Sequence, residues 1–289
     1  MNKKPQQLDQ SIISCGCLQL LYMRTDDYAP RIGSTDNGSI KVYSEYLDIL
    51  IVFDGTMSVS VFNQERNLSS GDVFFFTRST YAELRVTTSS FSGARLRFVR
   101  DKVSSRVIRN RFAASMVTNG IINQKIFNHC LTFIKFINDR NTSCSAYELE
   151  IIERENRDII DVLGMMIERQ HESLNIVQQN IEKADVVVEA INLIESRLKE
   201  SIKIRSLVEQ LGVSHSYFVR LFKKHLGVSP NVYSRTLKVN CAMSLLGDGK
   251  ESVSKVSCQL GFSDQSHFAN SFREALRVTP GALAMRILC

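Results

Sequence analysis

The chain contains few of the residue types that build metal, redox and disulfide sites. Its 289 residues include five histidines, and none of them precedes His129. A metal site built from histidine is therefore excluded from the part of the chain before His129. The seven cysteines are scattered and odd in number, and no two form a Cys-x-x-Cys pair. This usage favours free thiols in a reducing cytoplasm, and we expect neither a metal nor a cofactor.

Long apolar runs and low-complexity segments are also missing, and the chain has only four prolines. No run approaches the roughly 20 apolar residues of a membrane span, so no membrane partner is predicted. Ile12–Met23 is mildly apolar and follows two lysines, but Gly16 and Gln19 interrupt it and no small-residue cleavage site comes after it. An N-terminal strand is therefore favoured over a signal peptide. At 44% hydrophobic residues, the chain can support two ordinary cores.

A segment that occurs twice near the C-terminus is the most informative pattern. Gln-Leu-Gly at 210–212 recurs at 259–261, an offset of 49 residues. Beyond it the offset is 50 residues, and the matched apolar positions are Phe218, Phe222, Leu226, Val228 and Pro230 with Phe268, Phe272, Leu276, Val278 and Pro280. Two copies are too few for a solenoid, so they indicate one supersecondary unit that is used twice.

Each copy is typical of two helices joined by a glycine-containing turn. In the first, Ile204–Leu211 predicts a short helix that Gly212 ends, and Ser214 fits the N-cap of the next helix. That second helix has an apolar stripe expected to face a core: Tyr217, Phe218, Leu221 and Phe222. In the second copy Gly261 breaks the first helix, and Ser263 or Asp264 caps the next. This is the arrangement of a DNA-binding helix-turn-helix.

The positive charge of the chain lies in the same region. Ala190–Cys289 contains 14 Lys and Arg against 7 Asp and Glu, a net charge of +7, whereas the whole chain has 36 against 30. The first 189 residues therefore have 22 against 23, a net charge of −1. A basic domain attached to a near-neutral one is the electrostatic signature of nucleic-acid binding.

Four stretches of the basic region match a known family. They are Leu-Gly-Val-Ser-His-Ser-Tyr-Phe-Val-Arg-Leu-Phe-Lys-Lys at 211–224, Gly-Val-Ser-Pro at 227–230, Gly-Phe-Ser-Asp-Gln-Ser-His-Phe at 261–268 and Val-Thr-Pro at 278–280. With them, the chain from about 190 to 286 resembles the AraC/XylS family of bacterial transcription regulators. It departs from the family at three places: Lys238 replaces a usual Arg, Val256-Ser257 replaces Ile-Ala, and Arg277 replaces a Gly.

The resemblance implies a fold and a set of partners. A long helix near Asn231–Leu246 would join two helix-turn-helix units and place both recognition helices in successive major-groove segments of promoter DNA. The expected partners are double-stranded promoter DNA and RNA polymerase, and activation is expected rather than repression. The family's base-contacting positions fall on Ser216, Val219 and Arg220 in the first copy and on Gln265, Ser266, Ala269 and Asn270 in the second.

The chemistry of these side chains agrees with base reading. Arg220 can pair with guanine O6 and N7, and Gln265 or Asn270 can pair with adenine N6 and N7. The apolar Val219 and Ala269 suit a thymine methyl group. Other basic side chains are predicted to contact phosphates, which fix position rather than sequence. They are His215, Lys223, Lys224, Arg235, Lys238, His267 and Arg273, and for the two histidines helix capping is the alternative.

The first part of the chain has the alternation of β-strands between about 40 and 100. Asp54-Gly55 is a hairpin signal, and the region predicts a small antiparallel β-barrel or sandwich. Phe-Asp-Gly at 53–55 and Leu-Ser-Ser-Gly-Asp at 68–72 resemble the cupin-like barrel common in the regulatory half of the family. An apolar pocket with arginines at its mouth could hold a small carboxylate. The candidates are Arg78, Arg85, Arg95 and Arg97, but we favour the interpretation that they form the solvated face of a strand.

Residues 103–173 return to helical spacing and predict helices that either pair two subunits or pack on the barrel. The expected fold is thus α+β and multidomain: a regulatory domain over 1–175 (barrel about 10–100), a linker over 176–186 and an all-α DNA-binding domain over 187–289. The predicted function is a sequence-specific transcription regulator. The alternatives are an enzyme or small-molecule-binding protein with an accessory basic domain and, within regulation, control by a protein partner instead of a small-molecule effector.

Overall fold

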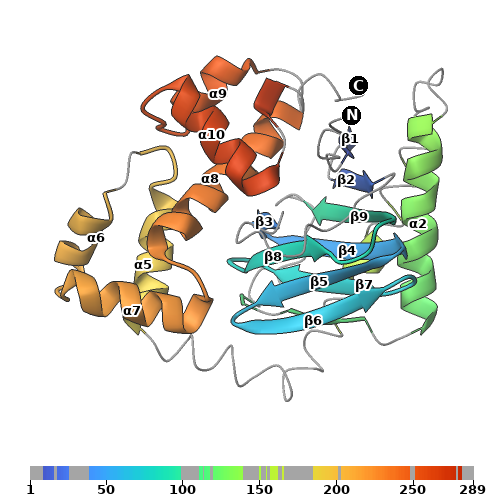
Figure 1. Cartoon of the computed structure of the whole chain (residues 1–289), viewed down its shortest axis with the longest axis horizontal. Coiled ribbons are helices and arrows are strands. Elements are labelled where there is room, and N and C mark those ends of the chain that lie inside the picture. The colour runs from blue at the N-terminus through green and yellow to red at the C-terminus, as the bar shows by residue number, and fades with distance from the viewer. Residues whose placement is uncertain are drawn as a thin grey trace, which may run out of the picture.

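The structure is a computed structural model in which an N-terminal part built from β-sheets lies beside a C-terminal part built from helices (Figure 1). The residues it describes are 9–15, 18–25, 39–98, 111–112, 114–117, 120–138, 150, 154, 157–161, 165, 185–200, 203–247, 251–277 and 279–281. The predicted linker over 176–186 lies outside them except for its last two residues, which begin a helix.

The described strands form two antiparallel sheets. They are β1 (Asp9–Cys15), β2 (Leu18–Thr25), β3 (Ile40–Tyr43), β4 (Leu47–Asp54), β5 (Thr56–Val61), β6 (Gln64–Ser69), β7 (Val73–Thr77), β8 (Tyr81–Val86), β9 (Phe91–Phe98) and β10 (Ala114–Met116). One sheet has the order β1-β2-β9-β4-β7-β10 and the other the order β3-β8-β5-β6. The described strands thus make two sheets and no closed barrel. The strand predicted within Ile12–Met23 is observed as the β1–β2 hairpin.

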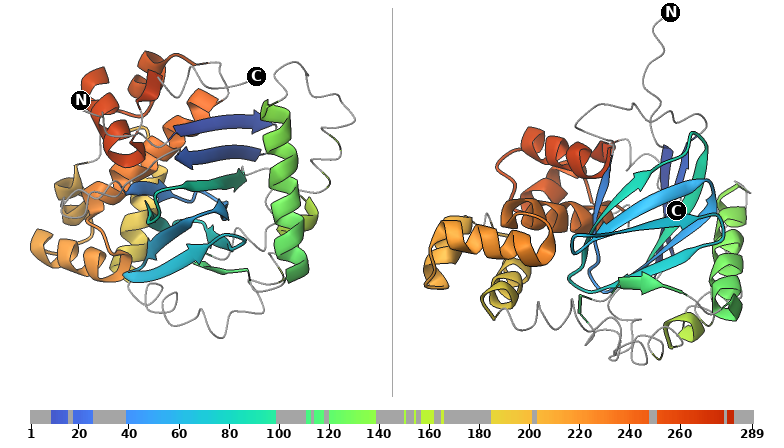
Figure 2. Two further views of the ribbon diagram at one scale, coloured as in Figure 1. Left: turned by 45° about the vertical axis from the view of Figure 1, so that its right-hand side comes forward. Right: turned by 60° about the horizontal axis from the view of Figure 1, so that its bottom comes forward.

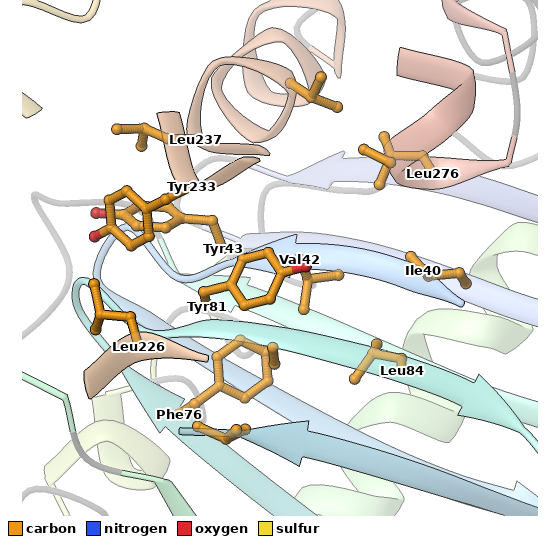
Figure 3. Packing of buried hydrophobic residues seen from close by; sticks show 14 of the residues in the cluster. Ile40, Val42, Tyr43, Phe76, Tyr81, Leu84, Leu226, Tyr233, Leu237 and Leu276 are labelled. Atoms are coloured by element: carbon orange, nitrogen blue, oxygen red, sulfur yellow. The ribbon is translucent and has the colours of Figure 1, made fainter. Parts of the chain in front are cut away.

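The sheets enclose an apolar core because their inward positions are aliphatic or aromatic. All five residues of β7 are buried, and β4 is buried from Leu47 to Val52. The same cluster continues into the helical part, where Tyr43 meets Tyr233 edge to face at 5.4 Å between ring centroids. Figure 3 shows Tyr43 of the sheets directly beside Tyr233 of the helices within this cluster. The two parts therefore share buried surface.

The C-terminal helices match the duplicated unit of the sequence. They are α5 (Asp185–Ser196), α6 (Ile204–Gln210), α7 (His215–Leu226), α8 (Pro230–Gly247), α9 (Val253–Gln259) and α10 (Gln265–Leu276). The pairs α6–α7 and α9–α10 are the two helix-turn-helix units, and α8 joins them. Gly212 and Gly261 both have φ near +64°, a conformation that glycine adopts without steric cost. The expected all-α domain with two such units is confirmed.

Helix α2 (Gly120–Asn138) lies on the side of the sheets opposite the C-terminal helices (Figures 1 and 2). Ile126 and Cys130 are buried, and the ring of Phe127 meets that of Phe53 at 5.0 Å. Packing on the sheets of its own chain, one of the two alternatives, is therefore observed. The second predicted stripe, over 149–167, lies largely outside the described residues. Within the described ranges, no helix has both the length and the apolar character needed to cross a bilayer.

Candidate nucleic-acid interface

The second helix of each unit presents a polar face to solvent. On α7, Ser216 and Arg220 are exposed and Val219 is half-buried, while Phe218, Phe222 and Leu226 are buried. On α10, Gln265, Ser266 and Asn270 are exposed and Ala269 is half-buried, while Phe268, Ser271, Phe272, Ala275 and Leu276 are buried. All seven residues predicted to read bases thus lie on the outer faces of α7 and α10.

Side-chain caps fix where both helices begin. The Ser214 hydroxyl accepts a hydrogen bond from the backbone N–H of Tyr217 at 3.3 Å. In the second unit the cap is Asp264, whose Oδ1 accepts from the backbone N–H of His267 at 2.6 Å. That bond, together with one from the Ser263 hydroxyl, lowers the pKa of the Asp264 carboxyl. Of the two caps left open by the sequence, Asp264 is the one observed.

Five of the residues predicted to contact phosphates are exposed on or beside these helices: His215, Lys223, Lys224, His267 and Arg273. The ring of His267 also lies near its own helix start, with Nδ1 3.2 Å from the Ser263 hydroxyl. Arg235 is half-buried and donates to Glu274 at 2.7 Å.

Lys238 does not lie on this surface. It is buried on α8, and its ammonium group donates to the backbone carbonyls of Glu200 and Leu260, each at 2.7 Å. Burial lowers the pKa of the Lys238 ammonium. Lys238 therefore ties the segment after α5 to the end of α9, and the expectation that it touches DNA phosphate is corrected because its charge points inward.

Tyr217 also differs from the expectation. The sequence placed it with Phe218 in the apolar stripe, but its side chain is 43% exposed. Neighbouring helical residues point about 100° apart, so a narrow stripe on α7 buries one of the two and not both. The guanidinium carbon of Arg220 lies 5.9 Å from the centroid of the Tyr217 ring.

The N-terminal part, which the sequence predicts to be regulatory and which is called the regulatory part below, contacts the helical part through polar groups that are buried or half-buried. Glu195 of α5 accepts hydrogen bonds from Tyr43 at 2.7 Å and Ser79 at 2.6 Å, and it pairs with Arg78 at 2.9 Å and Arg111 at 3.3 Å. Burial, with the nearby ring of Tyr233 and the Glu195 charge, raises the pKa of the Tyr43 hydroxyl, which therefore remains a donor. One carboxylate of the DNA-binding part thus has four partners in the regulatory part.

A second contact joins the larger sheet to the middle of α8. Arg95 and Arg97 of β9 are 1% and 4% exposed and share the carboxylate of Asp48, at 2.6 Å and 3.5 Å. Both guanidinium groups also donate to the side-chain oxygen of Asn240, at 3.1 Å and 2.5 Å. Burial, only partly offset by Asp48, lowers the pKa of Arg95 to about 10.

These contacts correct the expectation for the four arginines of the first half. Arg85 is exposed, as the favoured interpretation predicted. Arg95 and Arg97 are instead buried between the two parts of the chain, and Arg78 pairs with Glu195. Sequence reasoning missed Glu195 and Asn240 altogether, since a single Glu or Asn on a helix carries no signal of a distant partner.

A third contact involves the recognition helix α10 itself. Glu274 pairs with Lys41 of β3 at 3.3 Å and with Arg235 of α8 at 2.7 Å. Arg277, just after α10, donates to the backbone carbonyl of Ser39 at 3.2 Å. The regulatory part therefore contacts α5, α8 and α10 on surfaces away from the residues predicted to read bases.

Comparison with known proteins assigns the C-terminal region. A family model described as a helix-turn-helix domain matches residues 207–286. The regulatory protein PocR of Salmonella typhimurium is 30% identical over 98 residues, which are 34% of this chain and 32% of PocR. This region is therefore a helix-turn-helix domain of the AraC type, as the resemblance implied. As in PocR, several relatives match through about a third of the chain only.

Other relatives match over most of the chain. The Msm operon regulatory protein of Streptococcus mutans is 23% identical over 247 residues, 83% of this chain and 84% of that protein. The lactose operon transcription activator of Staphylococcus xylosus is 21% identical over 235 residues, 79% and 80% of the two chains. Both are named as regulators of operons, so the chain is an AraC-type regulator that binds DNA.

The fold of the whole chain is also found in a solved structure. ToxT from Vibrio cholerae, crystallised with an unsaturated fatty acid bound, is 12% identical with a TM-score of 0.57, and the match covers 99% of this chain and 98% of ToxT. This likeness establishes the two-part fold. Among the described residues, no group of three His, Cys, Asp or Glu side chains could hold a metal ion.

Proposed function

We propose that this protein is a sequence-specific regulator that reads two successive major-groove segments of promoter DNA, one with α7 and one with α10. The observation that carries the proposal is the pair of capped recognition helices, each with its aromatic face buried and its polar face exposed. The two helices are held by the single helix α8. Successive major-groove segments on one face of B-DNA are about 34 Å apart. Two recognition helices fixed on one scaffold can enter two such segments.

The proposed base contacts differ between the two helices. Arg220 on α7 reads guanine, while Gln265 and Asn270 on α10 read adenine. Because the copies share a buried face and differ on the exposed face, each protein molecule should read an asymmetric site and not an internal repeat. His215, Lys223, Lys224, His267 and Arg273 supply phosphate contacts around these readers.

Promoter activation through contact with RNA polymerase is the proposed outcome of binding. The relative from Staphylococcus xylosus is named an activator, which supports this direction. Pairing of two copies through the region of α2 is proposed as well, since Ile121 is 74% exposed on that helix and Leu131 is 38% exposed. A sedimentation run at several protein concentrations tests that pairing.

Control by the regulatory part acts through the buried polar contacts with the helices. A small-molecule effector and a protein partner are both compatible with this route, and ToxT, with its bound fatty acid, favours the former. A thermal-shift screen with sugars, fatty acids and pooled cell extract separates them. A stabilising low-molecular-weight fraction supports a small molecule, and a response confined to the protein fraction of the extract supports a partner.

Selection of bound duplexes from a random-sequence pool tests whether α7 and α10 recognise specific bases. The wild-type protein should enrich one asymmetric motif with two segments about one helical turn apart. The Arg220→Ala variant should lose the preference at one guanine and about 1–3 kcal/mol of binding free energy at that site, with the second segment unchanged. An enriched motif and an affinity that are identical for the two proteins would contradict the assignment of Arg220.

A further inference from the structure

An aromatic side chain lies exposed on the first recognition helix. Tyr217 is 43% exposed, whereas the adjacent Phe218 and the next aromatic, Phe222, are fully buried in the core. A single exposed aromatic is ordinary on a protein surface, so what matters here is the group that the ring contacts. The nearest charged group is the guanidinium of Arg220, whose central carbon lies 5.9 Å from the ring centroid.

Helical geometry explains why these two side chains meet. Residues three apart lie on the same side of an α-helix, so Tyr217 and Arg220 are neighbours along the edge of the reading face. Ser216 and Val219 lie on the other side of Arg220, toward the centre of that face. The distance is within the roughly 6 Å at which a cation and a ring attract one another. The Tyr217 ring thus lies beside the guanidinium of Arg220, on the side away from Ser216 and Val219.

We propose that Tyr217 is a positioning residue that orients the guanidinium of Arg220 for guanine recognition. The inference rests on the proposed function, in which Arg220 contacts a base. A free arginine side chain samples many rotamers, and bidentate pairing with guanine requires one orientation of its planar fork. A ring that limits those rotamers before binding reduces the entropy lost on binding, so it increases affinity and selectivity at that one base pair.

The second recognition helix shows that this arrangement belongs to the first helix alone. Fifty residues on, Tyr217 corresponds to His267, whose ring lies against Phe262 at 5.5 Å and beside the Ser263 hydroxyl. Arg220 corresponds to Asn270, a short side chain with few rotamers that needs no such ring beside it. The ring at position 217 therefore lies beside a long base-reading side chain, Arg220. The ring at position 267 instead packs at the start of its own helix.

The contact between the regulatory part and α7 lies away from Tyr217. Among the residues that the structure describes, the regulatory part hydrogen-bonds to α7 at the far end of the helix, where the Asn63 amide donates to the carbonyl of Lys224 at 3.2 Å. Tyr217 lies in the first turn of α7, next to the Ser214 cap. Its side chain is thus free to act on DNA recognition in the full-length protein.

The test is a double-mutant cycle on the intact protein. Four proteins are compared: wild type, Tyr217→Leu, Arg220→Ala and the double variant, with Tyr217→Phe as the matched control that keeps the ring. Each is measured on the duplex enriched by the wild type from a random pool, and on the same duplex with the guanine read by Arg220 replaced. Thermal unfolding verifies that each variant folds. Because Tyr217 is exposed, its replacement should leave folding intact.

Tyr217→Leu should weaken binding to the enriched duplex by about two- to fivefold, the range of an exposed cation–π contact. It should have no effect on the replaced duplex or in the Arg220→Ala background, and Tyr217→Phe should bind like the wild type. Equal loss on both duplexes, an added loss in the Arg220→Ala background, or no loss at all would overturn the proposal. If the wild type enriches no motif, the proposed function fails instead, so the two failures are distinguishable.

Discussion

At the scale of the residue, the direction in which a basic side chain points decides what it does. Lys223 is exposed on α7, whereas Lys238 is buried on α8 and donates to two backbone carbonyls. A formal charge in a basic domain is therefore not by itself a phosphate contact. The two lysines form a natural pair for separating DNA binding from folding.

Replacing each lysine by alanine should affect different quantities. Lys223→Ala should leave the unfolding temperature unchanged and reduce the salt dependence of DNA binding by about one unit of slope, because one phosphate contact is lost. Lys238→Ala should lower the free energy of unfolding by about 1–3 kcal/mol, since the buried carbonyl of Leu260 and the half-buried carbonyl of Glu200 lose their donor. For Lys238→Ala, the slope of log affinity against log salt concentration should equal that of the wild type. Affinity measured against salt concentration, alongside thermal melts, checks both, and a reduced slope for Lys238→Ala would contradict its buried position.

At the scale of the element, capping sets the start of each recognition helix. The folded-state pKa of Asp264 lies below its unfolded value because backbone N–H groups of α10 and the Ser263 hydroxyl bond to the carboxylate. Its contribution to stability is thus complete above the unfolded pKa, near 4, and is lost as the pH falls through the folded pKa. The recognition helix α10 should therefore loosen in acid.

Asp264→Asn isolates that effect, because asparagine caps a helix without titrating. The variant should show a smaller loss of stability than the wild type when the pH is lowered from 5 to 3, about the range of carboxyl titration. The Ser214→Ala variant, on α7, should cost about 1 kcal/mol at every pH. Unfolding melts across this pH range make the comparison. An unchanged acid dependence in Asp264→Asn would mean that this carboxylate does not contribute.

The elements were predictable to different degrees. Both helix-turn-helix units could be derived from the sequence because glycine turns, caps and apolar spacing act within a few residues, as at Gly212 and Ser214. Tyr217 was placed wrongly because neighbouring aromatics compete for one buried stripe. The arginines of β9 were misjudged for another reason. Arg95 meets Asn240 across 145 residues of sequence, and no local pattern records such a partner.

At the scale of the whole molecule, the regulatory and DNA-binding parts are joined by charged side chains, of which only Arg95 and Arg97 are fully buried. Glu195 connects the regulatory part to α5, the pair Arg95 and Arg97 connects it to α8, and Lys41 connects it to α10 through Glu274. A change in the sheets can thus reach the helices that hold both readers. The predicted regulatory role depends on this mechanical link.

Glu195→Ala should weaken that link. Removing the carboxylate leaves two guanidinium groups without their partner, and the partly exposed positions of Arg78 and Arg111 limit the cost to about 1–3 kcal/mol. The matched control is Glu189→Ala, an exposed glutamate on the same helix, which should change the melting temperature little. Thermal unfolding and protease sensitivity between the two parts measure the effect. If both variants melt alike, Glu195 does not hold the parts together.

We propose above that α7 and α10 together read one asymmetric DNA site. DNase footprinting of the purified full-length protein on the DNA upstream of its own gene, at low salt where phosphate contacts are strongest, tests it most directly. We expect a protected stretch that contains two contacted segments about one helical turn apart and of unlike sequence. Absence of protection, or protection of a perfect internal repeat by a single protein molecule, would contradict it.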